Sequence, residues 1–407
     1  MDKNFINFHI LISHSPSCLN RDDMNMQKSA IFGGRRRVRI SSQSLKRTMR
    51  KSPYYEQYLG KSSIRSRDLG LLKEEFLKEL KDEFTEEVIQ EALERFVKTR
   101  ATAEENDDQA DEDTENESGK KLAVAPWIKE EFKILCGVVK EVQAAGLTPE
   151  EEGKANKDFE KQKKPKKGDK KPLQYFREKL VAKKIESKME ESKAALLAAI
   201  GSAKDVALSG RMATSGLMTT VEGALAVAHV ITTHTVDADI DWFTAVDDLQ
   251  DLGAGHLDTQ EFSSGVFYRY ASLNIGQLQG NLGNASREKA LEVASHILHL
   301  MATVVPSGKQ QSFAAHNLAD LAMVSFADVP VSLANAFEEP VKAGPGGGFL
   351  KSSIKTFHDY WQNVHAGYAL DEMCGEFVIG QVQPPAGIKP AKTLDELKAW
   401  VRGNGEG

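Results

Sequence analysis

A stretch of sequence without one acidic side chain, residues 28–51, constrains the fold and function of this chain more than any other feature. Its cations are Lys28, Arg35, Arg36, Arg37, Arg39, Lys46, Arg47, Arg50 and Lys51. The whole chain carries a formal net charge of -6 at pH 7, so this stretch opposes the charge of the rest. Such a reversal indicates either an anion-binding surface or a solvated basic face.

The first part of the stretch, Arg35–Ile40, alternates between cationic and apolar side chains and predicts a short strand. Because neighbouring residues of a strand face opposite sides, Val38 and Ile40 are expected to pack in a core. Arg37 and Arg39 are then expected to point away from that core.

A helix is expected after the strand, because Ser41 and Ser42 offer N-cap hydroxyl groups. Polar side chains then recur at i, i+3, i+4 and i+7 and form one stripe, Gln43, Lys46, Arg47 and Arg50. Leu45 and Met49 fall on the opposite side and predict a buried face. A helix N-terminus with free N–H groups, hydroxyl groups and a basic stripe is suited to binding the phosphates of a nucleic acid.

The composition indicates a globular protein with a sizeable core. The chain has 407 residues, of which 41% are hydrophobic and 28% charged, so we expect one large domain with insertions or two domains. No apolar run is long enough to cross a membrane and no signal-type leader precedes Phe5, so the expected location is the cytoplasm. Cys18, Cys136 and Cys374 are far apart, which argues against disulfides and against a zinc site.

Residues 65–204 are expected to form a helical insertion, because apolar residues recur there at helical spacing. Residues 103–118 are mostly acidic and polar without a large apolar anchor, which predicts a mobile loop. Residues 151–172 combine many lysines with proline and glycine and predict a second disordered loop. A solvated linker is the favoured interpretation of this lysine-rich tract, and an arm that binds nucleic acid is the alternative.

After Lys204 the composition of the sequence changes, and small and β-branched residues become frequent. Ala207–Gly216 is expected to be a strand that runs into a turn flanked by glycines. Because glycine lets a backbone or a base approach closely, Arg211 and Met212 are expected to be approachable by a nucleic-acid base.

A polar excursion between apolar strands, residues 235–264, is typical of an arm that projects from a sheet. It contains many carboxylates and no lysine or arginine, so it is not expected to attract phosphates. Its carboxylates are expected to stay in water or to meet the basic stretch of a neighbouring copy. Trp242, Phe243 and Val246 are unusually apolar for a loop that only connects two strands. They are expected to cover an unstacked base.

Without the insertion and the arm, the order of strand, helix, strands, helix and strand suits an α/β (α+β) sandwich of the ferredoxin-like, RNA-recognition-motif type. The usual aromatic signature of that motif is absent. The expected parts of the main domain are residues 1–64, 205–234 and 265–407.

The competing class is an enzyme, such as a ribonuclease that uses His9 or His14 as general acid and base. Such catalysis needs titratable groups that converge on one pocket, and the sequence offers no such set. His296 and His299 lie three residues apart on an expected helix without a further ligand nearby. We therefore expect neither a metal site nor a cofactor.

Several stretches closely resemble one family, the CasC backbone subunits of the type I-E CRISPR Cascade complex. They are residues 5–28, 32–35, 37–47, 207–216, 239–248 and 259–270, with Ile240-Asp-Trp-Phe-Thr-Ala-Val-Asp-Asp248 especially distinctive. The resemblance covers residues of about 4–100 and 205–403. The acidic loop and the lysine-rich tract depart from it and enlarge the helical insertion.

The resemblance implies a hand-like, non-enzymatic protein whose copies polymerise along a guide RNA. The main domain would be a palm that holds the RNA backbone, the helical insertion would be the fingers, and the hairpin arm would be a thumb. Each thumb would displace one base at regular intervals, so that the guide can pair with target DNA in antiviral defence. The implied RNA contacts are Arg21, Lys28, Ser41, Gln43, Lys46 and Arg50 in the palm, Met212 against a base, and Trp242, Phe243, Thr244 and Val246 in the thumb.

The implied partners are the guide (CRISPR) RNA, target DNA bound through it, neighbouring copies of the chain and other Cascade subunits, without a membrane. A CRISPR-type endoribonuclease that processes guide RNA is the alternative function.

Overall fold

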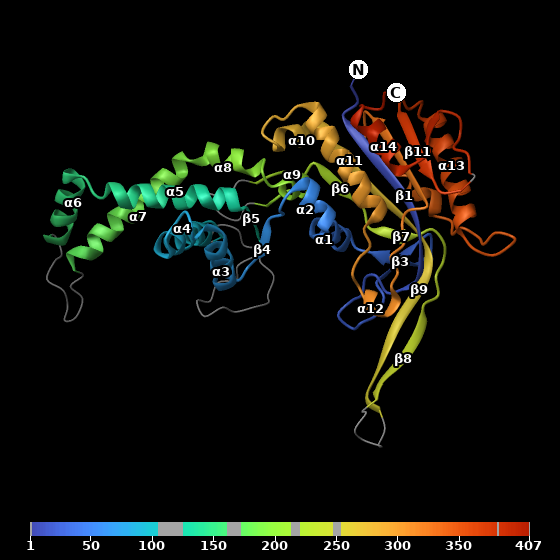
Figure 1. The fold of residues 1–407 in the computed structure, drawn as a ribbon, viewed down its shortest axis with the longest axis horizontal. Helices are drawn as coiled ribbons and strands as arrows, with labels where there is room; N and C mark the ends of the chain where they lie inside the picture. The colour runs from blue at the N-terminus through green and yellow to red at the C-terminus, as the bar shows by residue number, and fades with distance from the viewer. Residues whose placement is uncertain are drawn as a thin grey trace. The chain divides into compact units, whose positions relative to one another are not determined.

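The computed structural model describes residues 2–104, 125–160, 172–212, 220–246, 254–380 and 382–406. The chain forms two compact units (Figure 1). Unit 1 comprises Met1–Lys61, Ala224–Gly280 and Asn284–Gly407, and unit 2 comprises Ser62–Gly223 and Asn281–Gly283. Nearly all of the expected acidic loop at 103–118, and the part of the lysine-rich tract at 161–171, lie outside the described residues.

Unit 1 is built on a large mixed sheet with the strand order β12-β11-β10-β1-β9-β7-β3-β2, and β6 and β8 also pair with β9. The strands are β1 Phe5–Ser17, β2 Ser29–Phe32, β3 Arg35–Ile40, β6 Leu225–Val227, β7 Val230–Thr232, β8 Asp239–Val246, β9 Ala254–Asn274, β10 Leu321–Ala327, β11 Met373–Val378 and β12 Ile388–Ala391. β11 and β12 are parallel, whereas β1 is antiparallel to both of its neighbours. Together with the helices, this sheet confirms the expected mixed α/β class.

Strand β1 lies between β9 and β10, inside the sheet. Ile6, Phe8 and Ile10 are fully buried, as expected for a strand that has neighbours on both sides and helices on both faces. The strand continues to Ser17 and pairs with β9 along this length, with a register shift between His14 and Ser17. Residues 13–17 are therefore part of the sheet.

Helices pack on both faces of this sheet. The helices of unit 1 are α1 Ser42–Lys51, α2 Pro53–Leu59, α10 Ile275–Asn281, α11 Arg287–Thr303, α12 Gln310–Phe313, the 3₁₀ helix η1 Ala334–Phe337, α13 Leu350–Gly367 and α14 Leu394–Arg402. Phe337 of η1 and Phe357 of α13 pack with Leu321 of β10 on one face. Phe326 lies an odd number of residues from Leu321 on β10 and so faces the other side, where its ring contacts Trp400 of α14 at 5.5 Å.

Unit 2 is mainly helical, as expected from the sequence. Its elements are β4 Ile64–Ser66, α3 Leu69–Leu80, α4 Glu86–Glu104, β5 Ala125–Trp127, α5 Lys129–Ala145, α6 Pro149–Glu160, α7 Leu173–Glu191, α8 Lys193–Ile200 and α9 Lys204–Ser209. The short strands β4 and β5 pair antiparallel. Phe76 and Phe132 stack at 4.0 Å between ring centroids within a core that α3, α4, α5, α7 and α8 share.

Two local expectations for this unit were wrong. Residues 151–160 were expected to belong to a linker but lie in α6, because Thr148 and Glu151 form a capping box with reciprocal bonds of 2.7 and 3.3 Å. The beginning of the strand expected at residues 207–216 belongs to α9. Val206, Ala207 and Leu208 are consecutive and all buried, so helix packing and not strand alternation decides their conformation.

Strand β3 forms where expected, but Arg37 does not point away from the core. Arg37 is fully buried, and its guanidinium group donates to the carbonyl oxygens of Thr232 at 3.1 Å, Phe337 at 2.9 Å and Glu338 at 3.2 Å. Both faces of β3 are covered at this point, because Val38 is buried as well. Arg37 therefore joins β3 to its surroundings and does not contribute to an exposed basic surface.

Candidate nucleic-acid interface

Helix α1 carries the polar residues that the sequence selects. Ser41 is its N-cap, and the side chain of Ser41 accepts a hydrogen bond from the N–H of Ser44 at 3.2 Å. Leu45 and Met49 are buried, as expected, and Gln43 is exposed on the other side of the helix. Lys46 and Arg50 are half-buried, so the stems of these two long side chains lie along the protein surface.

The N-terminus of α1 is more completely capped than expected. The N–H of Ser42 donates to Nδ1 of His229 at 3.0 Å, in addition to the bond between Ser44 and Ser41. Burial and the nearby charge of Arg39 lower the pKa of His229, which keeps this imidazole neutral and able to accept. The expectation of free N–H groups is therefore wrong at Ser42 and Ser44, and side chains are left as the main anion-binding groups of this helix.

Asn20 joins the candidate residues Ser41 and Lys28. Its side-chain oxygen accepts from the N–H of Ser41 at 2.8 Å, and its carbonyl oxygen accepts from the N–H of Lys28 at 2.9 Å. The carbonyl oxygen of Lys28 in turn accepts from the N–H of Arg39 at 2.8 Å. These bonds fix the chain around Lys28 against β3 and the start of α1.

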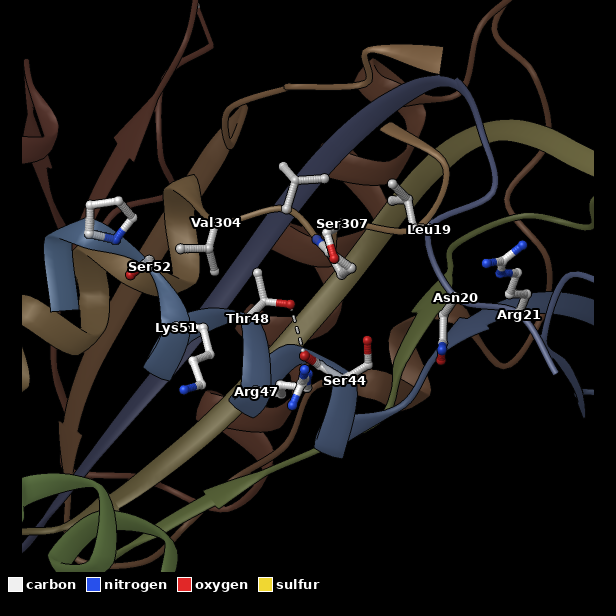
Figure 2. Close-up of a pocket in the computed structure, with 14 residues that line it drawn as sticks. Leu19, Asn20, Arg21, Ser44, Arg47, Thr48, Lys51, Ser52, Val304 and Ser307 are labelled. Carbon is white, nitrogen blue, oxygen red and sulfur yellow. Dashed lines mark hydrogen bonds between the residues drawn. The ribbon is translucent and has the colours of Figure 1, made fainter. Parts of the chain in front are cut away.

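An open groove of about 550 Å³ runs beside α1 (Figure 2). Its lining includes three cations, Arg21, Arg47 and Lys51, and four hydroxyl groups, those of Ser44, Thr48, Ser52 and Ser307. No carboxylate lines the groove among the described residues. Cations and hydroxyl groups without a competing carboxylate favour a phosphate-bearing ligand.

The side of α1 that lines the groove overlaps the expected polar stripe only at Arg47. Figure 2 shows Ser44, Arg47, Thr48 and Lys51 along the helix, opposite Val304 and Ser307. Of the palm residues implied by the family resemblance, Arg21 lines the groove. The other five do not: Lys28, Ser41, Gln43, Lys46 and Arg50. The helix therefore offers two polar sides, and Arg47 belongs to the groove.

Sequence reasoning missed the second wall of the groove, Val304–Gly308. This segment follows α11 and approaches the residues just after β1 so closely that a Cβ atom on Gly308 would lie 2.7 Å from the carbonyl oxygens of Cys18 and Leu19. The glycine after Pro306-Ser307 signals a tight approach, but the sequence does not reveal that the partner is the segment before Arg21. The pairing depends on contacts between residues almost 300 positions apart.

The expected hairpin arm at residues 235–264 contains an antiparallel ribbon of β8 and β9. Figure 1 shows this ribbon projecting from the rest of unit 1. Trp242 pairs with Thr259, and 66% of its surface is exposed. The backbones of Phe243, Thr244 and Val246 belong to β8, but the side chains of these three residues lie outside the described part of the structure.

One carboxylate of the arm has a role that was not expected. Glu261 is buried, accepts from the N–H of Gln27 at 2.8 Å and pairs with Arg36 of the same chain at 2.8 Å. The expectation that the arm's carboxylates stay in water or meet another copy is therefore wrong for Glu261. Arg36 is a partner of this carboxylate and is less available to a phosphate than its position in the basic stretch suggests.

Met212 belongs to unit 2, and 85% of its surface is exposed. The residue before it, Arg211, forms two backbone hydrogen bonds with Val221 at 2.9 and 2.8 Å. Residues 213–216 of the expected turn lie outside the described residues. The exposed thioether side chain agrees with the expectation that Met212 is approachable. The same expectation is wrong for Arg211, which is buried and paired with Glu131.

The histidines considered for catalysis are buried. Nδ1 of His9 lies 2.8 Å from the hydroxyl oxygen of Tyr268, and burial lowers the pKa of His9 to about 3. His14 lies between Asn317 and Arg269, and burial together with the charge of Arg269 lowers its pKa to about 3. Both imidazoles are therefore neutral near pH 7 and are covered by the protein.

The pair His296 and His299 packs against Tyr54 of α2. Nδ1 of His296 lies 2.8 Å from the Tyr54 hydroxyl oxygen, and the ring of His299 stacks on Tyr54 at 3.8 Å. In the described part of the chain, no group of three or more histidine, cysteine or acidic residues is arranged to hold a metal ion. The helices described in the structure also include none long and apolar enough to cross a membrane.

Two kinds of comparison place this geometry among known proteins. A family model described as "CT1975-like protein" matches residues 6–401. A chain of a solved "CRISPR RNA-guided surveillance complex, pre-nicking" is 25% identical, with a TM-score of 0.71 and coverage of 98% of this chain and 100% of that chain. A chain of another "CRISPR RNA-guided surveillance complex" is 21% identical with a TM-score of 0.55, over 97% of this chain and 98% of that chain, a likeness of fold alone.

No curated protein matches the chain significantly. The family match nevertheless spans parts of both units and includes the strand–helix segment of β3 and α1. It confirms the resemblance to the CasC backbone subunits that the sequence predicts. This chain belongs to the CT1975-like family.

Proposed function

We propose that this chain is an RNA-binding backbone subunit of a CRISPR RNA-guided surveillance complex that acts in the cytoplasm. Copies of the chain polymerise along a guide RNA and leave short segments of the guide free to pair with target DNA. The observation that carries this proposal is the groove beside α1, in which Arg21, Arg47 and Lys51 meet no carboxylate among the described residues. The family match and the similarity to a subunit of an RNA-guided surveillance complex support the same role.

Backbone contacts suit a subunit that has to carry any guide sequence. Contacts between cations and phosphates supply affinity and position the RNA, but they carry no sequence information. The hydroxyl groups of Ser44 and Thr48 add uncharged hydrogen-bonding groups along the same side of α1. The RNA path also includes Gln43, Lys46 and Arg50 on the other side of the helix, and Lys28 and Ser41, which Asn20 joins.

The parts of the hand follow from this assignment. The sheet of unit 1 with α1 is the RNA-recognition-motif-like palm, the helices of unit 2 are the fingers, and the β8–β9 ribbon is the thumb. Trp242, together with Phe243, Thr244 and Val246, covers a displaced base, and Met212 contacts a base from unit 2. Neighbouring copies and other subunits of the complex are the protein partners.

We also propose that the chain does not cleave its RNA. A general acid or base must exchange protons near pH 7 and reach its substrate, and His9 and His14 are buried and neutral. The endoribonuclease alternative would need another pair of titratable groups in the groove, whose described lining has only cations, an amide, hydroxyl groups and apolar side chains.

The groove is tested by a pair of variants that differ only in charge. Thr48→Asp introduces a carboxylate between Arg47 and Lys51, and Thr48→Asn introduces an amide of the same shape. Protein purified from cells that express a guide RNA is digested with nuclease, and the protected RNA is measured. We expect Thr48→Asn to retain a discrete protected RNA and Thr48→Asp to lose most of it. Equal protection in the two variants would show that no phosphate lies in this groove.

A further inference from the structure

A buried ion pair joins the start of α5 to the residue that precedes Met212. Arg211 donates to both carboxylate oxygens of Glu131, with distances of 2.7 and 3.0 Å. Arg211 is 3% exposed and Glu131 is 2% exposed. Both residues belong to unit 2.

The geometry of this ion pair fixes the orientation of the Arg211 side chain as well as its distance from Glu131. Two parallel hydrogen bonds between a guanidinium group and a carboxylate hold both groups in one plane. Glu131 lies in the first turn of α5, where the helix dipole favours a negative charge. Replacing a buried ion pair with apolar residues often preserves stability, so the pair is better explained by orientation than by stability alone.

The backbone around Arg211 is held from a second side. The two hydrogen bonds between Arg211 and Val221 close the base of the segment that carries Met212. Gly210 and Gly223 approach each other there, and a Cβ atom on Gly210 would lie 2.8 Å from the nitrogen of Gly223. Val221 packs on a small apolar cluster that includes Ile128, the N-cap residue of α5.

Met212 is the first residue beyond this fixed base. Its side chain is 85% exposed, although the residue before it is buried. A flexible thioether side chain can cover a base with precision only if its backbone leaves the protein in a defined direction. The ion pair and the backbone bonds of Arg211 supply that direction.

We propose that Glu131 is a positioning residue, which acts through Arg211 to aim Met212 at a base of the guide RNA. The inference rests on the proposed function, in which Met212 contacts a displaced base. It adds a residue from α5 that touches no RNA itself. Loss of Glu131 therefore disturbs the placement of the base and leaves the grip on the RNA backbone intact.

The test compares variants in the assembled complex by chemical probing of the guide bases. Glu131→Gln leaves the guanidinium group without its charged partner, and Glu131→Asp keeps the charge but shortens the side chain by one methylene. We expect both variants to blur the periodic reactivity of the guide in the same way as Met212→Ala. The affinity for RNA and its salt dependence are expected to equal those of the wild-type protein. Glu152→Gln is the matched control, because it removes a partly exposed ion pair with Arg177 in the same unit.

The outcomes separate the inference from the proposed function. The periodic reactivity of the guide bases could persist in Glu131→Asp and Glu131→Gln but be lost in Met212→Ala. That result would overturn the positioning role of Glu131 and would still support the contact between Met212 and a base. A sharp period in Met212→Ala as well overturns the inference and the base contact together. Absence of any RNA in the unchanged protein contradicts the proposed function itself. Because Glu131→Asp retains a compensated charge pair, it keeps the test valid even if Glu131→Gln does not fold.

Discussion

Removal of two cations from the groove should change the salt dependence of RNA binding by a calculable amount. Arg47 and Lys51 are both exposed on α1 and both line the groove. Alanine favours helix, so Arg47→Ala/Lys51→Ala should fold normally. If each cation neutralises one phosphate of a single strand, each removal lowers the slope of log affinity against log salt by about 0.7.

The double variant should therefore have a slope lower by about 1.4. Between 50 and 200 mM salt, the difference in affinity between the unchanged protein and the variant should shrink by a factor of about 7, the fourfold change in salt raised to that power. Fluorescence anisotropy with two unrelated single-stranded RNAs measures this quantity. The loss should be the same for both sequences, because backbone contacts do not read bases.

Two further variants make this measurement decisive. Lys351→Ala/Arg402→Ala removes two exposed cations of α13 and α14 and should leave the slope unchanged. Lys46→Ala/Arg50→Ala removes the cations of the other side of α1, and each substitution should lower the slope by about 0.7 if the RNA path continues there. An unchanged slope in Arg47→Ala/Lys51→Ala would refute the assignment of the groove to phosphates.

Three shorter predictions concern other parts of unit 1. The pKa of His9 is about 3 in the folded chain against 6.5 in a free peptide, so only the unfolded state gains a proton as the pH falls below 6.5. The unfolding free energy should then decrease by about 1.4 kcal/mol per pH unit between pH 6.5 and 3 from this residue alone, and thermal unfolding of His9→Gln should be less pH-dependent by that amount. Gly308→Ala should lower the unfolding free energy by about 1–3 kcal/mol, because its Cβ would lie 2.7 Å from two backbone oxygens. Gly280→Ala, which meets nothing within 4 Å inside α10, should instead stabilise the chain slightly in the same denaturant titration. Trp242→Ala should blur the periodic reactivity of the guide and leave the salt slope of RNA binding unchanged; a lowered slope with an intact period would contradict a role in covering bases.

The sequence predicts the β3–α1 segment well because its signals are local. The cap at Ser41 and the burial of Leu45 and Met49 depend on residues within one or two helical turns. Helix α13 has a local signal of the same kind, because Leu350, Ile354 and Phe357 recur at helical spacing.

Contacts between distant segments could not be predicted in this way. The alternation of β3 could not show that carbonyl oxygens from residues 232, 337 and 338 would surround Arg37. The same limit applies to Glu261, whose partner Arg36 lies 225 positions away. A charged residue in a regular pattern was interpreted as exposed in both cases, because burial of a charge depends on partners that the local pattern does not contain. The flanking glycines predict that Met212 is approachable. Its contact with a base of the guide is implied only by the family resemblance.

Strand β9 is unbroken from Ala254 to Asn274, pairing with β8 towards its start and with β1 towards its end. The ribbon and the sheet therefore share one continuous strand, β9, which connects them directly. The number of residues in each strand therefore sets how far the ribbon reaches. Two residues added to each strand between Trp242 and the sheet would extend its reach by about 6.7 Å and keep the indole on the same face. One residue added to each strand would send the indole to the opposite face, so the reach of the ribbon can change only in steps of two residues per strand.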